Sequence, residues 1–213
     1  MTSPSPPAPG LDHLVVAAAS LAEGTAWVED LLGVPLEAGG EHPQFGTHNT
    51  LLSLGPSCYL EVISVDPQGR QPERPRWFAL DTTDLLTGPR LHHWVVRPRA
   101  MAGRRHVENF RRGDLRWQLT VPPDGSLEHG GLVPSCIHWE TAHPCSRLPD
   151  HRVRLDALQL RTPEPEHLRE ELQRMDVPEA GAEVVPAQRR QLLARLTGPA
   201  GTVELSEGGA RDE

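Results

Sequence analysis

The sequence predicts an α+β fold in which repeated βαβββ units form curved mixed sheets around a cup, followed by a C-terminal βαββ piece. The main evidence is a repeated strand opening: LDHLVVAA at residues 11–18 returns as LHHWVVRP at residues 91–98, with His13 aligned to His93. A fainter copy, LDALQLRT, begins at residue 155. Neither a GxGxxG nor a P-loop pattern occurs, so we do not expect a doubly wound nucleotide-binding sheet.

The first unit is expected to span residues 11–66. Its opening strand is a short apolar run with valines, which is typical of a buried strand. A helix follows, because Ser20 and Glu23 form a capping box and Gly33 supplies a stop signal. Further strands are expected at residues 35–38, 49–54 and 59–65, which gives the order βαβββ.

The second unit is expected to span residues 91–145. Residues 67–90, which precede it, contain four prolines and are expected to form a linker laid over the surface. Within the unit we expect a poorly patterned helix at residues 100–112, followed by strands at 114–121 and 132–140.

The C-terminal piece is expected to span residues 153–206. Its first strand is followed by a helix with Pro163 at its first position and then by a hairpin, which gives a partial βαββ unit. Residues 1–10 and 207–213 are expected to be tails outside the fold.

Composition limits the classes of partner. The 213 residues carry a formal net charge of −8, whereas a nucleic-acid-binding surface needs a strongly basic face. No stretch approaches the roughly 20 apolar residues of a membrane span, and the first residues lack the basic start and apolar run of a signal peptide. The three cysteines lack metal-ligand spacing and are expected to be reduced, and Cys58 and Cys136 are expected to be inert core thiols. We therefore expect a cytoplasmic protein with no nucleic-acid or membrane partner.

Several motifs together resemble one protein family. The opening DHLVVAA, the helix end LLGV, the loop GTHN and the strand YLEVISVDP are similar to the glyoxalase-like domains of the vicinal oxygen chelate superfamily. The later segments GDLRW, TVPPDGS and GGLVPSCIHWE resemble the second half of the same family. The resemblance covers about residues 11–145 and implies paired units around a cup. It does not identify a substrate, because this fold carries unrelated chemistries.

The resemblance also implies a set of metal ligands. In metal-dependent members, ligands come from the first and last strands of each unit, which places them here at His13, Glu61 and His93. The fourth position falls on Ser135, which is not a ligand, and Glu204 of the C-terminal piece is an alternative if that piece packs opposite the first unit. Two imidazoles and one carboxylate suit a divalent ion of Zn, Ni, Fe, Mn or Co.

Other residues are candidates for contact with a substrate. A metal ion would act as a Lewis acid on a small oxygen-rich or carbonyl metabolite, and Glu61 or His48 is the candidate for proton transfer. Asn49, Trp94 and Trp117 are expected to line the substrate pocket. A local arginine cluster that includes residues 111 and 112 is typical of a solvated helix face, but one of its guanidinium groups could bind a substrate carboxylate.

Three functions remain open from the sequence. The first is a metal-assisted lyase or isomerase, and the second is a metal-free small-molecule-binding protein of the resistance or sequestration type. The third is an interaction module whose C-terminal piece forms an oligomer surface, for example in a homodimer. His13 is explained equally well by hydrogen bonding or ligand contact as by metal ligation, and a one-residue shift in register would bring His92 into the cup in place of His93.

Overall fold

The first βαβββ unit forms as predicted in the computed structural model, which describes residues 8–176 and 181–212. The unit consists of β1 (Gly10–Ala17), α1 (Leu21–Leu32), β2 (Glu37–His42), β3 (Thr47–Ser53) and β4 (Tyr59–Val65). The Ser20 hydroxyl accepts the backbone N–H of Glu23 at 3.2 Å, and Gly33 ends the helix with a left-handed φ of 67°. Most of the predicted N-terminal tail lies outside the described residues.

The second unit differs from the prediction because it has no α-helix in its described residues. It consists of β5 (Arg90–Arg97), β6 (Val107–Arg112), β7 (Leu115–Thr120) and β8 (Ser135–Trp139). The helix expected at residues 100–112 is wrong, since its second half is β6 and residues 98–106 form an irregular loop. Phe110 on β6 is paired opposite Trp117 on β7, and this cross-strand pair outweighs the weak helical pattern of the segment.

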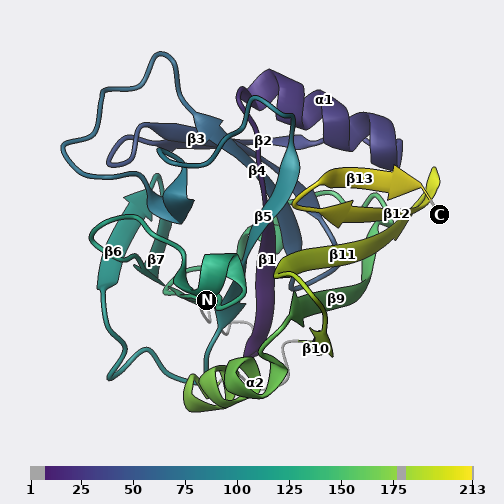
Figure 1. The fold of residues 1–213 in the computed structure, drawn as a ribbon. Helices are drawn as coiled ribbons and strands as arrows, with labels where there is room; N and C mark the ends of the chain where they lie inside the picture. Colours follow the sequence, from purple (N-terminus) through teal and green to yellow (C-terminus); the bar gives the residue numbers. More distant parts are fainter. Residues whose placement is uncertain (1–7, 177–180, 213) are drawn as a thin grey trace.

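The two units share one eight-stranded sheet with the order β2-β3-β4-β1-β5-β8-β7-β6. Strand β1 lies near its middle, parallel to β4 and antiparallel to β5 (Figure 1). The second unit, and not the C-terminal piece, therefore pairs with the first. The sheet curves until its edge strands β2 and β6 come into contact, which closes the cup.

The C-terminal piece contains more strands than the predicted βαββ pattern. It consists of β9 (Arg154–Thr162), α2 (Pro165–Arg174), β10 (Ala182–Pro186), β11 (Gln191–Gly198), β12 (Gly201–Ser206) and β13 (Gly209–Asp212). These strands form a separate sheet with the order β10-β9-β11-β12-β13. The predicted hairpin is β11 and β12, but the predicted tail at residues 207–213 is mostly β13, because it pairs with β12.

The two faces of the eight-stranded sheet pack differently. On the outer face, Leu14 and Val16 of β1 pack with α1 and with leucines of the C-terminal sheet, such as Leu192 and Leu205. The C-terminal sheet contacts β5, so it covers the part of the outer face that a helix of the second unit would otherwise cover. Each buried side chain of this size contributes about 1.5–3 kcal/mol.

The inner face is covered by aromatic side chains. They come from several parts of the chain: Phe45, Trp77, Phe78, Phe110, Trp117 and Trp139. Two of them belong to the segment 67–90, which was expected to lie on the surface. That segment instead turns inward at a short 3-10 helix (Trp77–Ala79), because the Ala79 amide donates to the Gly125 carbonyl at 2.7 Å.

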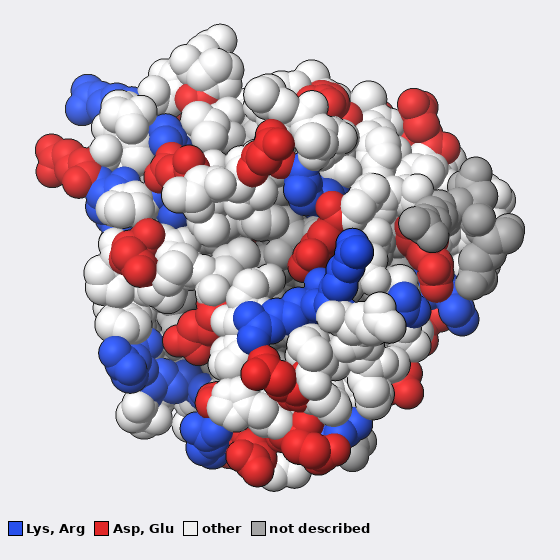
Figure 2. Space-filling view, viewed as in Figure 1, with Lys and Arg blue, Asp and Glu red and all other residues white. Residues whose placement is uncertain are grey.

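The described part of the chain contains no helix with the length and apolar character needed to cross a bilayer. Acidic and basic side chains alternate over the face of the molecule shown in Figure 2 and do not gather there into one patch of a single sign. This distribution agrees with the mixed composition of the sequence and its modest net negative charge.

Candidate functional site

A small cavity on the inner face contains two of the three predicted metal ligands. Its volume is about 30 Å³, enough for one or two water molecules. His13 and Glu61 line it together with aromatic, polar and aliphatic side chains: His42, Asn49, Leu51, Tyr59, Trp77, Phe78, Arg112, Trp117, Leu119, Ile137, Trp139 and Pro144.

Strand register explains how these side chains meet. His13 is paired with Tyr59, and Val15 with Glu61, across the parallel strands β1 and β4. Because side chains alternate along a strand, Tyr59 and Glu61 share the inner face with His13. Asn49 reaches the same face from β3, and the His13 and Tyr59 rings stack with centroids 4.5 Å apart.

A completely buried carboxylate lies behind His13. The His13 Nδ1 atom donates to Asp12 Oδ1 at 2.7 Å. A register shift between residues 11 and 13 in the pairing of β1 with β5 marks a bulge at Asp12, which explains how adjacent side chains approach each other. Asp12 Oδ2 accepts from three further donors: Arg97 Nη1 at 2.7 Å, and Trp139 Nε1 and His143 Nε2 at 3.1 Å each.

These donors keep the Asp12 carboxylate ionised. Burial on its own raises the pKa of Asp12, but the hydrogen bonds from His13 and His143 outweigh it and bring the pKa well below its ordinary value. The carboxylate therefore holds a proton on His13 Nδ1 and directs Nε2 into the cavity. It has the orienting role that a buried aspartate has beside a catalytic histidine.

Glu61 faces the free nitrogen of His13. His13 Nε2 and Glu61 Oε2 are 3.6 Å apart, while Glu61 Oε1 accepts from Asn49 Nδ2 at 2.5 Å. The amide oxygen of Asn49 accepts from Gly40 N at 2.8 Å and from Arg112 at 3.3 Å, which fixes the orientation of its amide group. Glu61 thus has one oxygen held by Asn49 and one available toward His13.

Tyr59 adds a neutral hydroxyl group beside this pair. Burial raises the pKa of Tyr59 well above its ordinary value, and the negative charges of Asp12 and Glu61 raise it further. The phenol therefore stays protonated over the physiological range. It differs in this respect from the ionised Asp12.

Arg112 closes the outer end of the cavity. It extends from the end of β6 toward β2 and β3, where Nη1 donates to His42 Nε2 at 3.0 Å. Burial, followed by the charges of Arg112 and His48, lowers the pKa of His42 to about 3, so its ring is neutral and accepts this bond. Arg112 also borders two outer hollows of about 210 and 760 Å³, so its side chain separates them from the inner cavity.

The third predicted ligand, His93, lies on the inner face but has other contacts. Its Nε2 accepts from the backbone N–H of Ser135 at 3.2 Å, and the Phe78 ring lies 5.2 Å from it between centroids. Burial, and then the charge of His92, lowers the pKa of His93 to about 3. His93 lines a different cavity of about 410 Å³, between the second unit and α2.

The structure therefore brings two of the three predicted ligands together. His13 Nε2 and Glu61 Oε2 are 3.6 Å apart. A divalent ion with bonds of about 2.1 Å to both atoms fits a separation of this size. His93 does not join them within 4.8 Å. In the described chain, the three residues whose ligand atoms lie this close to one another are His129, His167 and Glu171. The alternative ligand Glu204 lies in the C-terminal sheet, beside Arg195.

The remaining predicted residues divide between the two faces of the sheet. Asn49 and Trp117 line the cavity. Trp94 is packed in the outer core and donates to the Leu132 carbonyl at 3.0 Å, and His48 alternates with Asn49 and so points away from the cup. His92 is not in the cavity either, because its Nε2 donates to the Phe78 carbonyl at 2.6 Å and holds the aromatic turn in place.

Sequence reasoning missed Asp12, His42 and Tyr59, and it included Arg112 only as one member of an arginine cluster that could bind a carboxylate. An acidic residue inside the apolar run LDHLVV was the available signal for Asp12, since such a residue needs partners when buried. No local signal singled out Arg112 from the other arginines of its cluster, because its position depends on the contact between the two ends of the sheet.

Comparisons with known proteins agree with this fold. The family model of the glyoxalase-like domain matches residues 11–175. A hypothetical protein from Staphylococcus aureus superposes with a TM-score of 0.60 and 10% identity, over 86% of this chain and 88% of that one. The methylmalonyl-CoA epimerase from Mycobacterium tuberculosis has a TM-score of 0.41 and 22% identity, over 65% of this chain and 91% of that one. No curated protein matches the chain.

At 10% identity the Staphylococcus aureus structure indicates a shared fold alone. The family model, in contrast, covers most of the chain and both units of the curved sheet. This chain belongs to the glyoxalase-like domain family of the vicinal oxygen chelate superfamily.

Proposed function

We propose that the inner cavity catalyses a proton transfer on a small carbonyl metabolite that carries an acidic group, in a reaction of the isomerase or lyase type. The observation that carries this proposal is the separation of 3.6 Å between His13 Nε2 and Glu61 Oε2, in a buried cavity, with Asp12 behind His13. A carboxylate and an oriented imidazole side by side are the parts that proton abstraction next to a carbonyl group needs.

In this proposal Glu61 is the base. Its Oε2 removes a proton from the carbon next to the carbonyl group, and the electrons of that C–H bond move onto the carbonyl oxygen to give an enolate. His13, protonated on Nε2, donates a hydrogen bond to this oxygen, and the charge of Asp12 stabilises the imidazolium ring. Return of the proton from Glu61 to the same face of the carbon regenerates the substrate, whereas its return to the opposite face, after the enolate has turned over, inverts that carbon and completes an isomerisation. Asn49 keeps Glu61 in place throughout, because it binds the other oxygen.

Arg112 selects the acidic group. Its guanidinium lies at the cavity mouth, where its hydrogen-bond partners His42 and Asn49 are neutral, and a guanidinium binds carboxylate through paired hydrogen bonds. Movement of this side chain away from His42 would join the inner cavity to the neighbouring hollow of about 210 Å³. A substrate with a carboxylate at one end would thus place its carbonyl group near His13.

A metal ion held by His13 and Glu61 would supply a Lewis acid for the same carbonyl oxygen. The set of three ligands implied by the resemblance is not assembled here, because His93 is bound to Ser135. The proposed steps therefore use the side chains of the cavity. Elemental analysis of the wild type, His13→Ala and Glu61→Ala tests whether the two ligands retain a metal during purification.

The decisive experiment is proton exchange in D₂O. Small 2-oxo acids and related carbonyl acids are incubated with the protein, and the loss of the C–H signal is followed by proton NMR. We expect exchange with the wild type and a loss of about 10²–10⁴-fold in Glu61→Gln, which keeps the shape of the side chain but not the base. Equal exchange rates in both proteins for every compound would refute the proposal.

One observation favours a second function, binding without chemistry. The rings of Trp77, Phe78, Trp117 and Trp139 give the cavity wall an aromatic character suited to a planar apolar ligand. In that case ligand-detected NMR would show binding to the wild type and to Glu61→Gln alike, with no exchange in either protein.

We also propose that the protein works in the cytoplasm. Cys58, Cys136 and Cys145 are free thiols. Burial raises the pKa of all three, to about 11 for Cys136 and about 12 for Cys145, so they stay protonated and unreactive. Unpaired cysteines of this kind suit a reducing compartment. A homodimer formed through the C-terminal sheet remains a prediction, which sedimentation velocity tests.

A further inference from the structure

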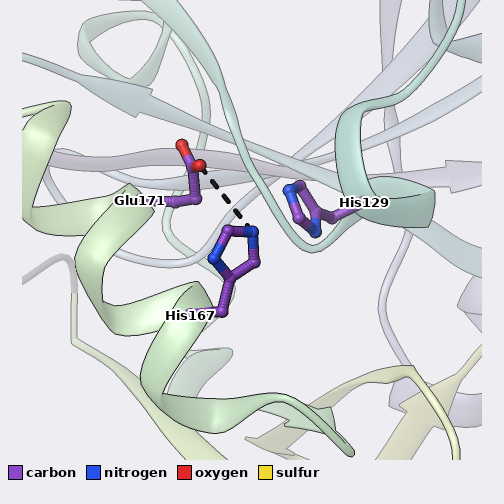
Figure 3. Close-up of side chains that lie close together, drawn as sticks. All are labelled: His129, His167 and Glu171. Carbon is purple, nitrogen blue, oxygen red and sulfur yellow. Dashed lines mark ion pairs between the residues drawn. The ribbon is translucent and has the colours of Figure 1, made fainter.

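A cluster of possible metal ligands lies outside the inner cavity, where the second unit meets the C-terminal piece. His129 belongs to a 3-10 turn (Glu128–Gly131), and His167 and Glu171 belong to α2. Figure 3 shows the two helical side chains on one face of α2, with His129 approaching His167 from the opposite loop. One ligand atom from each residue lies within 4.8 Å of the other two.

The positions of the three residues favour a shared ligand. His167 and Glu171 are four residues apart, so they are neighbours on the helix surface, with Nε2 and Oε1 3.9 Å apart. The rings of His129 and His167 are 5.2 Å apart between centroids. Donors in a tetrahedral site with bonds of about 2.1 Å lie about 3.4 Å apart, so side-chain rotation needs to draw them together by at most about 1.4 Å.

The chemistry of the donors defines the ion. Two imidazoles and one carboxylate suit Zn²⁺, Ni²⁺ or Co²⁺ and leave a position for water. His167 is exposed and the other two side chains are half-buried, so an ion can enter from solvent. Glu171 Oε1 also accepts from Arg174 at 2.9 Å, and the carboxylate keeps a second oxygen for the ion.

We propose that His129, His167 and Glu171 bind a divalent transition-metal ion that clasps the 3-10 turn to α2. The turn belongs to the eight-stranded sheet domain and α2 to the C-terminal piece, so the ion would connect two parts of the molecule that otherwise pack through side chains. Glu171 and Glu128 also line the cavity of about 410 Å³ that contains His93, so the clasp would fix one wall of it.

Metal binding to protein without a polyhistidine tag tests the proposal. Isothermal titration with Zn²⁺, and the visible absorption of bound Co²⁺, are measured for the wild type, His129→Ala, His167→Ala and Glu171→Gln. We expect one ion per chain at this site and affinities lower by more than about tenfold in each variant. His138→Ala is the matched control, since it removes an exposed histidine outside the cluster.

A second control separates this site from the inner cavity. His13→Ala removes the cavity histidine and is expected to leave the clasp ion in place, so failure of the proposed catalytic function would not affect this result. Unchanged affinity in His129→Ala would overturn the proposal, because binding by the helical pair alone would not connect the two parts.

Hydrogen exchange provides an independent measurement. On addition of Zn²⁺ we expect slower amide exchange in both residues 128–131 and residues 165–174 of the wild type, and in neither segment of His129→Ala. Protection of the helix alone in the wild type would also contradict the clasp.

Discussion

The buried carboxylate of Asp12 is predicted to be one of the largest single contributions to stability. It is completely buried and accepts hydrogen bonds from four side chains, including the guanidinium of Arg97, which is itself buried. Asp12→Asn keeps the size of the side chain but replaces one acceptor oxygen with a donor and removes the charge. Either His13 or the group of three donors on the other oxygen then loses its acceptor.

The size of the effect follows from the charge left behind. Removing one partner of a buried ion pair lowers the free energy of unfolding by about 3–5 kcal/mol. Asp12→Asn keeps one carbonyl oxygen as an acceptor, so its effect is expected near the lower end of this range, at about 3 kcal/mol. The measurement is urea unfolding at pH 7, compared with the wild type. Asp114→Asn is the control, since Asp114 forms an exposed pair with Arg147 and its loss should change the free energy of unfolding little.

The pH dependence gives the same prediction a second test. The pKa of Asp12 in the folded protein lies well below its ordinary value, so the carboxylate contributes stability above the unfolded pKa of about 3.9. That contribution is lost as pH falls below this value. The difference between the wild type and Asp12→Asn should therefore be constant from pH 7 to about pH 5 and narrow below pH 4. A difference under about 1 kcal/mol at pH 7 would refute the account of a buried charge network.

Three further predictions concern the core, the buried histidines and the cavity mouth. Gly24→Ala should lower the free energy of unfolding by about 1–3 kcal/mol in urea, because the added Cβ would lie 2.6 Å from Ala18 Cβ and Val62 Cγ1. Because burial lowers the pKa of His93 to about 3, its neutral form contributes stability above pH 6.5 that is lost as pH falls toward 3. The urea midpoint of His93→Gln should therefore change less with pH between 6.5 and 3 than the midpoint of the wild type. Arg112→Ala should weaken carboxylate binding by about tenfold or more while leaving neutral analogues unaffected, as measured by ligand-detected NMR.

Local sequence patterns predicted the elements whose causes are local. The capping box at Ser20, the stop at Gly33 and the apolar opening of β1 lie within a few residues of the structure that they specify. The repeat of that opening at residues 91–98 also located β5, the partner of β1 in the centre of the sheet. The family resemblance also named Glu61, and alternation along β4 puts this side chain on the cavity face.

The features that the sequence did not reveal depend on contacts between distant segments. Residues 107–112 have little strand pattern of their own and become β6 because β7 pairs with them. His93 aligns with His13, but its Nε2 accepts a hydrogen bond from the backbone N–H of Ser135 on β8. The sequence around residue 93 contains no signal for this long-range contact. Arg112 reaches His42 only because the curved sheet brings its two edges together.

The position of the C-terminal sheet has a consequence for how this chain can be divided. Leu192, Ala194 and Leu205 lie against the back of the strands that form the cup, where Trp94 and Val96 are shielded from water. A fragment ending near residue 150 would keep every residue of the proposed chemistry but would expose that apolar surface, and an uncovered patch of this kind promotes aggregation. The last third of the chain, although far from the reacting groups, is therefore expected to be required for the first two thirds to stay in solution.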